Sequence, residues 1–282
     1  MKTKTSSTLF LILKWVILLV VLAAIYLPLV MIIAYSFSTT RSVGGEFGEF
    51  TFSLYKNLFQ NKALLTATKN SILIGLISAL LATVLGTTAS VGIHYMRKKT
   101  KAAVDAASQI TIVNTEIVTA MGFFLLMIFL RDTVRIPVNF SLGWLIITHT
   151  VITTPYVILT VSPRLKQLNP NLLEASMDLG AGPMRSLLTV MLPQLAGAMV
   201  SGFALAFTLS LDDFVVTNIN SFGANVDTIS TYVYSGIRKR LPADIRALST
   251  IIFVLVLTIL IVYNIVKNRK AKKEAQKKIL SK

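Results

Sequence analysis

The chain of 282 residues is 54% hydrophobic and only 14% charged, and its mean hydropathy is +0.71. Soluble domains carry about 25% charged residues, so this composition excludes an ordinary soluble protein and indicates a membrane protein. The net charge of +16 would suit nucleic acid as a partner, but the basic residues gather in short loops and in a tail, which argues against one.

Six apolar stretches are long enough to cross a bilayer as helices, which takes about 20 residues. Closed barrels show alternating patterns rather than unbroken apolar runs, so the predicted fold class is all-α. We expect a single membrane domain over residues 1–282 with six transmembrane helices, near 11–37, 69–95, 106–130, 141–162, 192–217 and 247–267.

The distribution of Lys and Arg predicts that both termini are cytoplasmic. One set of loops, together with the termini, holds 17 of the 28 basic residues, and the opposite set holds ten. Basic residues in short loops mark the cytoplasmic side of a membrane protein. Residues 268–282 are then a basic cytoplasmic tail, which we expect near anionic lipid.

The first outer loop, about 38–68, carries an aromatic cluster. Such residues can lie at the membrane interface or pack against the helix bundle, and contact with an external partner is the alternative. The members of the cluster are Phe47, Phe50, Phe52 and Tyr55.

Small residues mark the second and fifth predicted spans as closely packed, because glycine and alanine let helix backbones approach within a membrane. Gly75 and Gly86 lie in the second span, and Gly197 and Gly202 in the fifth. We expect these two helices in the bundle interior or at a subunit interface.

A short helix is predicted in the cytoplasmic loop 163–193. Asn169 and Pro170 supply an N-cap and a proline at the first helical position. A helix over 171–179 would place Glu174 and Asp178 on one side, four residues apart, and Gly180 would end it.

Four ionisable side chains fall within the predicted spans: Glu116, His149, Asp212 and Asp213. A charged side chain at mid-membrane costs at least ~2.5 kcal/mol, so such residues usually face a partner or a watery path. The two aspartates lie ~28–30 Å beyond Pro193, toward the outer end of their helix. Adjacent helical residues point about 100° apart, so we expect one to face a cavity and the other to cap or pair. We expect His149 to be a hydrogen-bonded packing residue.

The loop spacing resembles a known motif. Glu174-Ala175-Ser176, three residues, Gly180, nine residues, Val190, one residue and Leu192-Pro193 resemble the EAA loop of ABC-importer permeases. Ser176 and Val190 depart conservatively from Ala and Ile. The resemblance implies the type I permease fold and a loop that sits in a cleft on an ATPase subunit, with Glu174 facing the ATPase and Gly180 as a tight turn. It assigns coupling to Glu174, Ala175, Ser176, Asp178, Gly180, Leu192 and Pro193.

Catalysis is not expected of this chain. It has no glycine-rich loop ending in Gly-Lys-Ser/Thr, so ATP and its Mg²⁺ would be bound by a partner ATPase. It has no cysteine from which to infer a disulfide or a thiolate metal site. We expect no cofactor and no metal on this chain.

A second resemblance concerns the cargo. The run from Leu205 to Val216, with Arg164-Leu165-Lys166 and Leu173–Gly180, is similar to spermidine/putrescine permeases of the PotC type. Those permeases commonly have Pro-Asp where this chain has Thr115-Glu116, which leaves the role of that acid open. Carboxylates suit polyamines through ion pairs, and aromatic walls through cation–π contacts. The resemblance implies a substrate path of Glu116 and Asp212 or Asp213, with Phe207, Phe214 or Tyr156 as walls, although an interhelical salt bridge could explain any single acid.

The sequence therefore predicts a multi-pass permease subunit in the bacterial cytoplasmic membrane. The resemblance implies a heterodimer with a homologous permease, two copies of an ABC ATPase and an extracytoplasmic polyamine-binding protein. Import of another small solute is an alternative, and so is a secondary transporter driven by an ion gradient. A gradient-driven carrier has no need of the docking helix.

Overall fold

A computed structural model describes residues 3–40, 46–169, 171–224, 226–238, 243–258, 261–262 and 265. These residues are mostly helical, and their only strand-like pairing is one isolated bridge between Ser38 and Phe50. The chain divides into two compact units, Met1–Lys62 with Gly236–Lys282, and Ala63–Ser235. The predicted basic tail 268–282 lies outside the described residues.

The first unit combines α1 (Thr3–Tyr35), α2 (Ser53–Gln60) and a helix over 244–258. The side chains of Phe10–Tyr35 are largely exposed, as expected of an apolar helix in lipid or against another chain. The aromatic loop packs on itself, because the ring of Phe37 lies 5.3–5.6 Å from those of Phe50, Phe52 and Tyr55. Arg246 ties this loop to the last helix by donating to the carbonyl of Thr40 at 2.6 Å.

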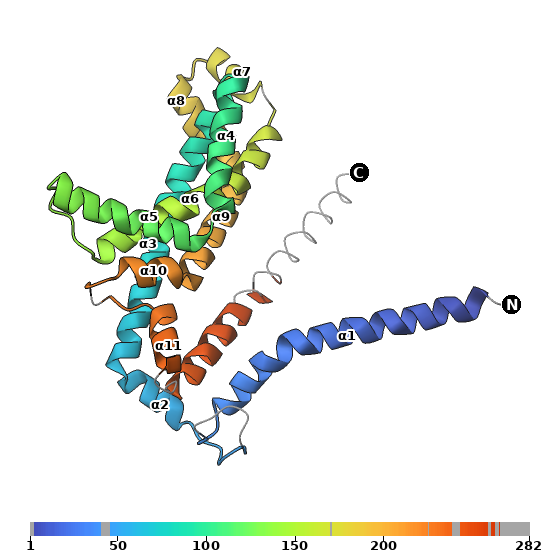
Figure 1. The fold of residues 1–282 in the computed structure, drawn as a ribbon. Helices are drawn as coiled ribbons and strands as arrows, with labels where there is room; N and C mark the ends of the chain where they lie inside the picture. The colour runs from blue at the N-terminus through green and yellow to red at the C-terminus, as the bar shows by residue number, and fades with distance from the viewer. Residues whose placement is uncertain are drawn as a thin grey trace. The chain divides into compact units, whose positions relative to one another are not determined.

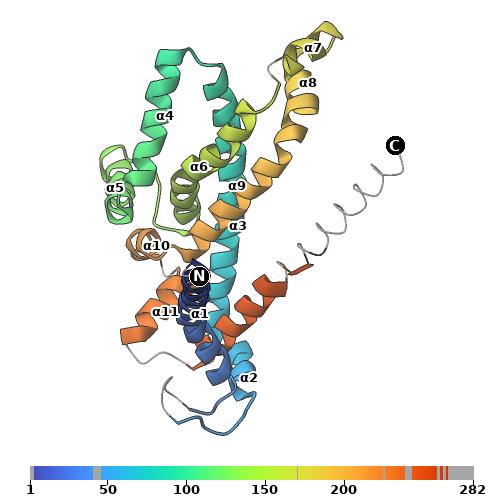
Figure 2. The ribbon, with the colours of Figure 1, turned by 90° about the vertical axis from the view of Figure 1, so that its right-hand side faces the viewer.

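The second unit is built around three long helices. They are α3 (Lys62–Tyr95), α6 (Leu142–Lys166) and α9 (Leu192–Asp212), and only Lys62, the first residue of α3, belongs to the first unit. Between α3 and α6, α4 (Lys98–Val113) runs back in the opposite direction and α5 (Glu116–Ile128) turns across it, before a π-helical turn at Phe129–Thr133 (Figures 1 and 2). The other short elements are α7 (Leu172–Asp178), α8 (Pro183–Ser186), a π-helical turn at Leu187–Met191, α10 (Val215–Asn220) and α11 (Ile229–Arg238).

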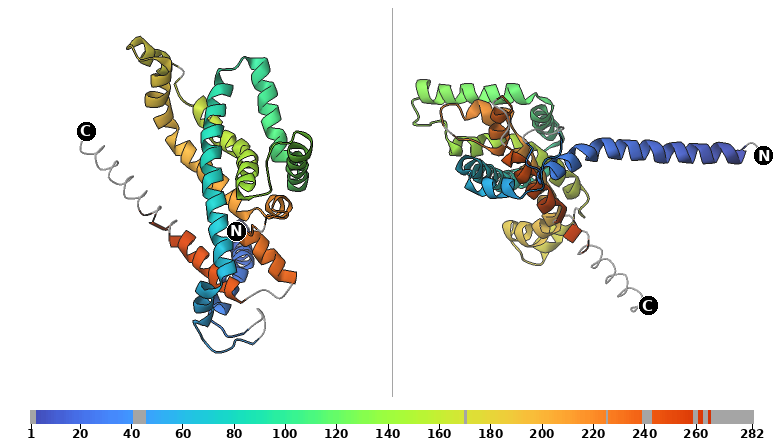
Figure 3. Two further views of the ribbon diagram at one scale, coloured as in Figure 1. Left: turned by 90° about the vertical axis from the view of Figure 1, so that its left-hand side faces the viewer. Right: turned by 90° about the horizontal axis from the view of Figure 1, so that it is seen from below.

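The core of this unit lies where α3, α6 and α9 meet, with α3 the long upright helix in both Figure 2 and the left view of Figure 3. Glycines make the close approach possible: a Cβ on Gly86 would lie 2.7 Å from Val157, and one on Gly202 would lie 2.6 Å from the Thr160 hydroxyl. The close packing predicted for the second and fifth spans, which are α3 and α9, is present. The buried apolar residues of the core are Ala79, Ala82, Val157, Val161, Leu165, Met191, Leu195 and Ala206.

Four helices among the described residues are long and apolar enough to span a membrane: Phe10–Tyr35, Lys62–Tyr95, Leu142–Lys166 and Pro183–Asp212. The third predicted span, 106–130, was wrong as a continuous helix. Asn114 and Thr115 adopt extended backbone angles between α4 and α5, and the Asn114 amide donates to the Thr119 hydroxyl at 3.1 Å. This bond connects the two sides of the break. The sixth predicted span is described only in part.

The fifth predicted span, 192–217, also ends earlier than expected. Helix α9 stops at Asp212, because Asp213 takes an extended conformation with ψ 124° before α10 begins at Val215. The Asp213 carboxylate accepts from the backbone N–H groups of Val216 and Thr217 at 3.2 and 2.8 Å. These contacts satisfy donors that the start of a helix leaves unpaired, and so they stabilise the break.

Candidate functional site

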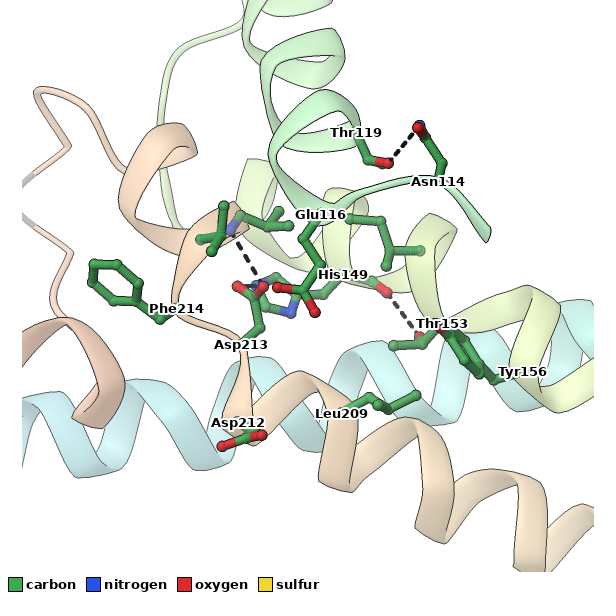
Figure 4. A pocket seen from close by; sticks show the side chains of 13 residues that line it. Asn114, Glu116, Thr119, His149, Thr153, Tyr156, Leu209, Asp212, Asp213 and Phe214 are labelled. Carbon is green, nitrogen blue, oxygen red and sulfur yellow. Dashed lines mark hydrogen bonds and ion pairs between the residues drawn. The ribbon is translucent and has the colours of Figure 1, made fainter. Parts of the chain in front are cut away.

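The two helix breaks and the middle of α6 surround a cavity of about 190 Å³ in the second unit (Figure 4). One wall comes from the α4–α5 break, one from α6 and one from the α9–α10 break. Its lining residues are Asn114, Glu116, Thr119, His149, Ile152, Thr153, Tyr156, Leu209, Asp212, Asp213, Phe214, Val215 and Val216.

Glu116 lies at the cavity because the third span breaks immediately before it. It is the first residue of α5, where a carboxylate is favoured by the helix dipole. Figure 4 shows its side chain pointing from α5 toward the space beside His149 and Asp213. It is exposed and forms no hydrogen bond or ion pair within the part of the chain that the structure describes.

Asp212 is the last residue of α9, and the helix dipole opposes a carboxylate there. Its side chain is exposed and has no hydrogen-bond or ion-pair partner among the described residues. An unpaired carboxylate added to the negative end of a helix attracts a cation. Half-helix C-terminal ends serve this purpose in other transporters.

Asp213 stands in a different environment, although it is the next residue. Its side chain is 12% exposed. Besides the two backbone N–H groups of α10, it accepts a hydrogen bond from the Thr217 hydroxyl at 3.0 Å. The expectation that one aspartate would face a cavity and its neighbour would cap matches this arrangement in part, because both residues line the cavity and only Asp213 caps.

His149 forms the buried floor of the site. Its side chain is 3% exposed, its Nδ1 lies 2.9 Å from the Ser210 hydroxyl, and its Nε2 lies 3.0 Å from the Thr217 hydroxyl. The ring also lies 3.7 Å from the Asp213 carboxylate. It is hydrogen-bonded as expected, but it also lines the cavity. Sequence reasoning missed Ser210 and Thr217, since single hydroxyls in an apolar run carry no signal of what they contact.

The three predicted aromatic walls differ in their positions. Tyr156 lines the cavity from α6. Phe214 also lines it, but its ring is turned away from Glu116 and packs on Tyr234 of α11 with centroids 4.1 Å apart (Figure 4). Phe207 lies outside the lining, because its ring fills the space left by Gly75, 3.1 Å from where a Cβ would stand, and stacks on Phe203.

The electrostatic character of the site is negative. Three carboxylates line the cavity, whereas no Lys or Arg does so within the described ranges. Two of the carboxylates, those of Glu116 and Asp212, have no partner in the same ranges. The arrangement can therefore hold a cation bearing more than one charge.

The predicted coupling loop lies at the other end of α9. Gly180 has φ +86°, a left-handed conformation that favours glycine, and its N–H donates to the carbonyl of Met177 at 2.8 Å. Ser176 contacts Ser186 at 2.9 Å, which joins α7 to α8. Leu173 packs on the core, while Leu179, the last residue of the predicted short helix, is 90% exposed.

Both acids of this loop, Glu174 and Asp178, are exposed on α7, and so is Ala175. Asn169 accepts from the backbone N–H of Asn171 at 3.0 Å, just before α7, while its neighbour Pro170 lies outside the described residues. Leu192 and Pro193 open α9. Pro183–Asp212 is one continuous helical stretch, so a single helix runs from the end of the loop to the cavity.

Comparison with known proteins identifies relatives that match most of this chain. Residues 71–273 match the family described as "Binding-protein-dependent transport system inner membrane component". The chain is 31% identical to the spermidine/putrescine transport system permease protein PotC of Haemophilus influenzae, covering 89% of this chain and 94% of that protein. It is 32% identical to the putrescine transport system permease protein PotI of Escherichia coli, covering 84% of each.

Solved structures show the same fold at low sequence identity. A chain of a bacterial ABC transporter involved in import of the acidic polysaccharide alginate superposes with a TM-score of 0.64 at 15% identity, covering 93% of this chain and 97% of that one. The same type of transporter in complex with a periplasmic protein bound to an alginate pentasaccharide gives a TM-score of 0.65, covering 92% and 94%.

Proposed function

The chain belongs to the family of binding-protein-dependent transport system inner membrane components, and from this premise we propose that it forms half of a pathway for polyamines. It is a permease subunit of an ABC importer with the all-α type I permease fold. It is not an enzyme, because ATP hydrolysis in such importers belongs to a separate ATPase subunit. The predicted class of protein is confirmed.

One observation supports a polyamine cargo above the others: Glu116 and Asp212 are unpaired carboxylates on one cavity that no Lys or Arg lines within the described ranges. Spermidine and putrescine carry ammonium groups separated by methylenes. Ammonium groups form charge-assisted hydrogen bonds with carboxylates, and the methylenes can contact Ile152, Leu209 and the ring of Tyr156. The same cavity repels anionic solutes.

The names of the relatives agree with a polyamine cargo without ranking its members. One is a spermidine/putrescine permease and another a putrescine permease, at almost equal identity to this chain. In our proposal Glu116 and Asp212 bind the cargo directly, Tyr156 contacts it, and Asp213 shapes the site. Phe207 and Phe214 support the neighbouring helices.

Importers of this family work with a second permease, an ATPase and an external binding protein. We propose in detail a heterodimer with a homologous permease, two ATPase copies that bind ATP and Mg²⁺, and a polyamine-binding protein outside. Both termini, with the tail 268–282 near lipid, would lie in the cytoplasm. The loop 163–193 would dock on the ATPase through Glu174, Ala175, Ser176 and Asp178, with Gly180 holding its turn and Leu192-Pro193 passing the motion to α9.

The test is uptake of labelled spermidine and putrescine into cells that lack this chain and retain its partners. Wild type should restore uptake of at least one polyamine. Glu116→Gln and Asp212→Asn should strongly lower this uptake while still co-purifying with the ATPase. Asp132→Asn is the matched control, because that acid is exposed and already paired with Arg131 at 2.7 Å. Wild type that assembles with its ATPase but imports neither polyamine would contradict the proposed cargo and leave the importer class intact.

A further inference from the structure

Beneath the cavity, four polar side chains from three helices form one continuous chain. Ser210 comes from α9, His149 from α6 and Thr217 from α10, and the chain ends on Asp213. The successive contacts are 2.9 Å from Ser210 to His149 Nδ1, 3.0 Å from His149 Nε2 to Thr217, and 3.0 Å from Thr217 to Asp213. All but Asp213 are buried.

The number of hydrogens available along this hydrogen-bond chain fixes which group donates at each contact. An ionised carboxylate only accepts hydrogen bonds, and a threonine hydroxyl has one proton. Thr217 donates that proton to Asp213, so toward His149 it can only accept. The Nε2 atom of His149 must therefore carry a hydrogen, and in a neutral imidazole Nδ1 then accepts the hydrogen bond from Ser210.

The geometry also favours a neutral ring over a charged one. His149 Nε2 lies 3.7 Å from the Asp213 oxygen, which is beyond a direct hydrogen bond. The carboxylate already accepts from Val216, Thr217 N–H and the Thr217 hydroxyl. A buried charge needs a directly paired, hydrogen-bonded partner, and this ring, with only 3% of its side chain exposed, has none.

We infer that His149 is a positioning residue, held as the neutral Nε2–H tautomer. Its Nδ1 accepts a hydrogen bond from Ser210 and its Nε2–H donates one to Thr217, so that the Thr217 hydroxyl is oriented to donate to Asp213. This inference rests on the proposed function, because it explains how Asp213 is held without a cationic partner in a site for a cationic cargo. A lysine or arginine partner would hold Asp213 equally well but would cancel its charge. A neutral donor chain stabilises the carboxylate and leaves the cavity negative for a cationic cargo.

The ionisable groups that line the cavity together with the ring are Asp213, which follows α9, and Glu116, Asp212 and Tyr156. A second proton on His149 would change this hydrogen-bond chain in two ways. Nδ1 would become a donor to Ser210, and the site would lose one unit of negative charge. The protonation state is therefore what an experiment must determine.

The direct test is ¹⁵N NMR of the imidazole in the full-length chain, labelled with ¹⁵N-histidine and reassembled with unlabelled partners in lipid bilayers. The chain has two histidines, so His94→Gln leaves His149 as its only imidazole signal. We expect one protonated nitrogen, Nε2, and one unprotonated nitrogen, Nδ1, from about pH 6 to pH 8, the range in which histidine ordinarily changes charge. An imidazolium signal near neutral pH, or the Nδ1–H tautomer, would overturn the inference.

Substitutions at Thr217 provide a second arm. Thr217→Ser keeps the hydroxyl and should keep the Nε2–H tautomer, whereas Thr217→Val removes the acceptor and should give a mixture of tautomers. An unchanged tautomer in a folded Thr217→Val chain would overturn the proposed relay. In uptake assays, His149→Gln keeps a donor at the Nε2 position and should retain most affinity, while His149→Phe should raise the KM for polyamine about tenfold or more.

Failure of this inference can be separated from failure of the proposed function. If the cargo were not a polyamine, uptake by wild type would fail, while the NMR result would still decide the state of His149. If the tautomer were wrong, Glu116→Gln and Asp212→Asn would still report on cargo binding. A KM for His149→Phe equal to that of wild type would count against a positioning role, whatever the tautomer.

Discussion

The two ends of the helical stretch Pro183–Asp212 differ in what they leave uncovered. At the cavity end, Asp213, His149 and Thr217 satisfy one another, and only the carboxylates of Asp212 and Glu116 remain unpaired in the described ranges. At the loop end, including Leu179 just before the stretch, three large apolar side chains are exposed. Leu179, Met184 and Leu188 are 90%, 67% and 55% exposed.

We propose that this difference reflects the partner of each end. A pair of free carboxylates in a cavity suits a small cation, and exposed apolar side chains on a loop predicted to be cytoplasmic suit a contact with another protein. In our proposal, this one helical stretch carries the cargo site at one end and the docking surface at the other. Substitutions that affect one end alone, both ends or neither test this division.

The largest effect is expected at the cavity end. Asp212→Asn removes the charge without changing shape, and a hydrogen bond to a charged group contributes about 1.5–3 kcal/mol. The KM for polyamine uptake should rise at least about tenfold, while the amount of ATPase that co-purifies stays at the wild-type level. Asp212→Glu, which keeps the charge, should recover part of the affinity. An unchanged KM in Asp212→Asn would remove this residue from the cargo site.

A substitution in the middle of the stretch should affect both ends. In Gly202→Ala the new Cβ would lie 2.6 Å from the Thr160 hydroxyl, and such overpacking typically costs 1–3 kcal/mol. We expect a lower melting temperature in detergent, with uptake and ATPase assembly falling together. Gly197→Ala is the matched control, because nothing lies within 4 Å of its Cβ. Equal melting temperatures for the two variants would contradict the close α6–α9 packing.

At the loop end the decisive property is backbone conformation. Gly180 and Gly182 both have open space around a Cβ, but only Gly180 has a positive φ. Gly180→Ala should cost roughly 1 kcal/mol in the turn and reduce ATPase co-purification several-fold, with polyamine binding unaffected. Gly182→Ala should resemble wild type. Similar losses in both variants would show that side-chain volume, rather than conformation, limits docking.

The smallest effect is expected at Asp132, outside both ends. A hydrogen bond from Arg131 lowers the pKa of this carboxyl. The resulting stabilisation is present above the pKa of the unfolded chain and is lost as pH falls through the lowered folded value. Because the pair is exposed, Asp132→Asn should leave melting temperature, uptake and ATPase assembly unchanged at neutral pH. A clear drop in any of them would reveal a contact outside the described residues.

The sequence allowed the class of protein and the short helix and turn of the loop 163–193 to be predicted, because long apolar runs and a fixed motif spacing are local signals. The turn at Gly180 and the glycine contacts of α3 and α9 agree with those signals. The two helix breaks could not be predicted in the same way. Asn114-Thr115 and Asp213 interrupt apolar runs that satisfy every length criterion, and what stabilises Asp213 is a set of hydrogen bonds made only after folding.

The same limit applies to the proposed cargo site. Glu116, Tyr156 and Asp212 could be selected from the sequence as costly or aromatic residues in a membrane, and the structure brings them to one cavity. Phe207 was selected on equal grounds and lies elsewhere, against Gly75. The difference between Asp212 and Asp213 depends on where α9 ends, so residue type and spacing could not separate them.

The central claim is that the cavity end binds cargo and the loop end transmits the action of ATP. The most direct test measures ATP hydrolysis and spermidine uptake in the same proteoliposomes, containing the complete transporter with Asp212→Asn or Gly180→Ala. We predict that Asp212→Asn keeps hydrolysis and strongly lowers uptake, so that more ATP is hydrolysed per cargo molecule imported, while Gly180→Ala lowers both in parallel. An assembled Asp212→Asn transporter that lost hydrolysis and uptake together would contradict this division of roles.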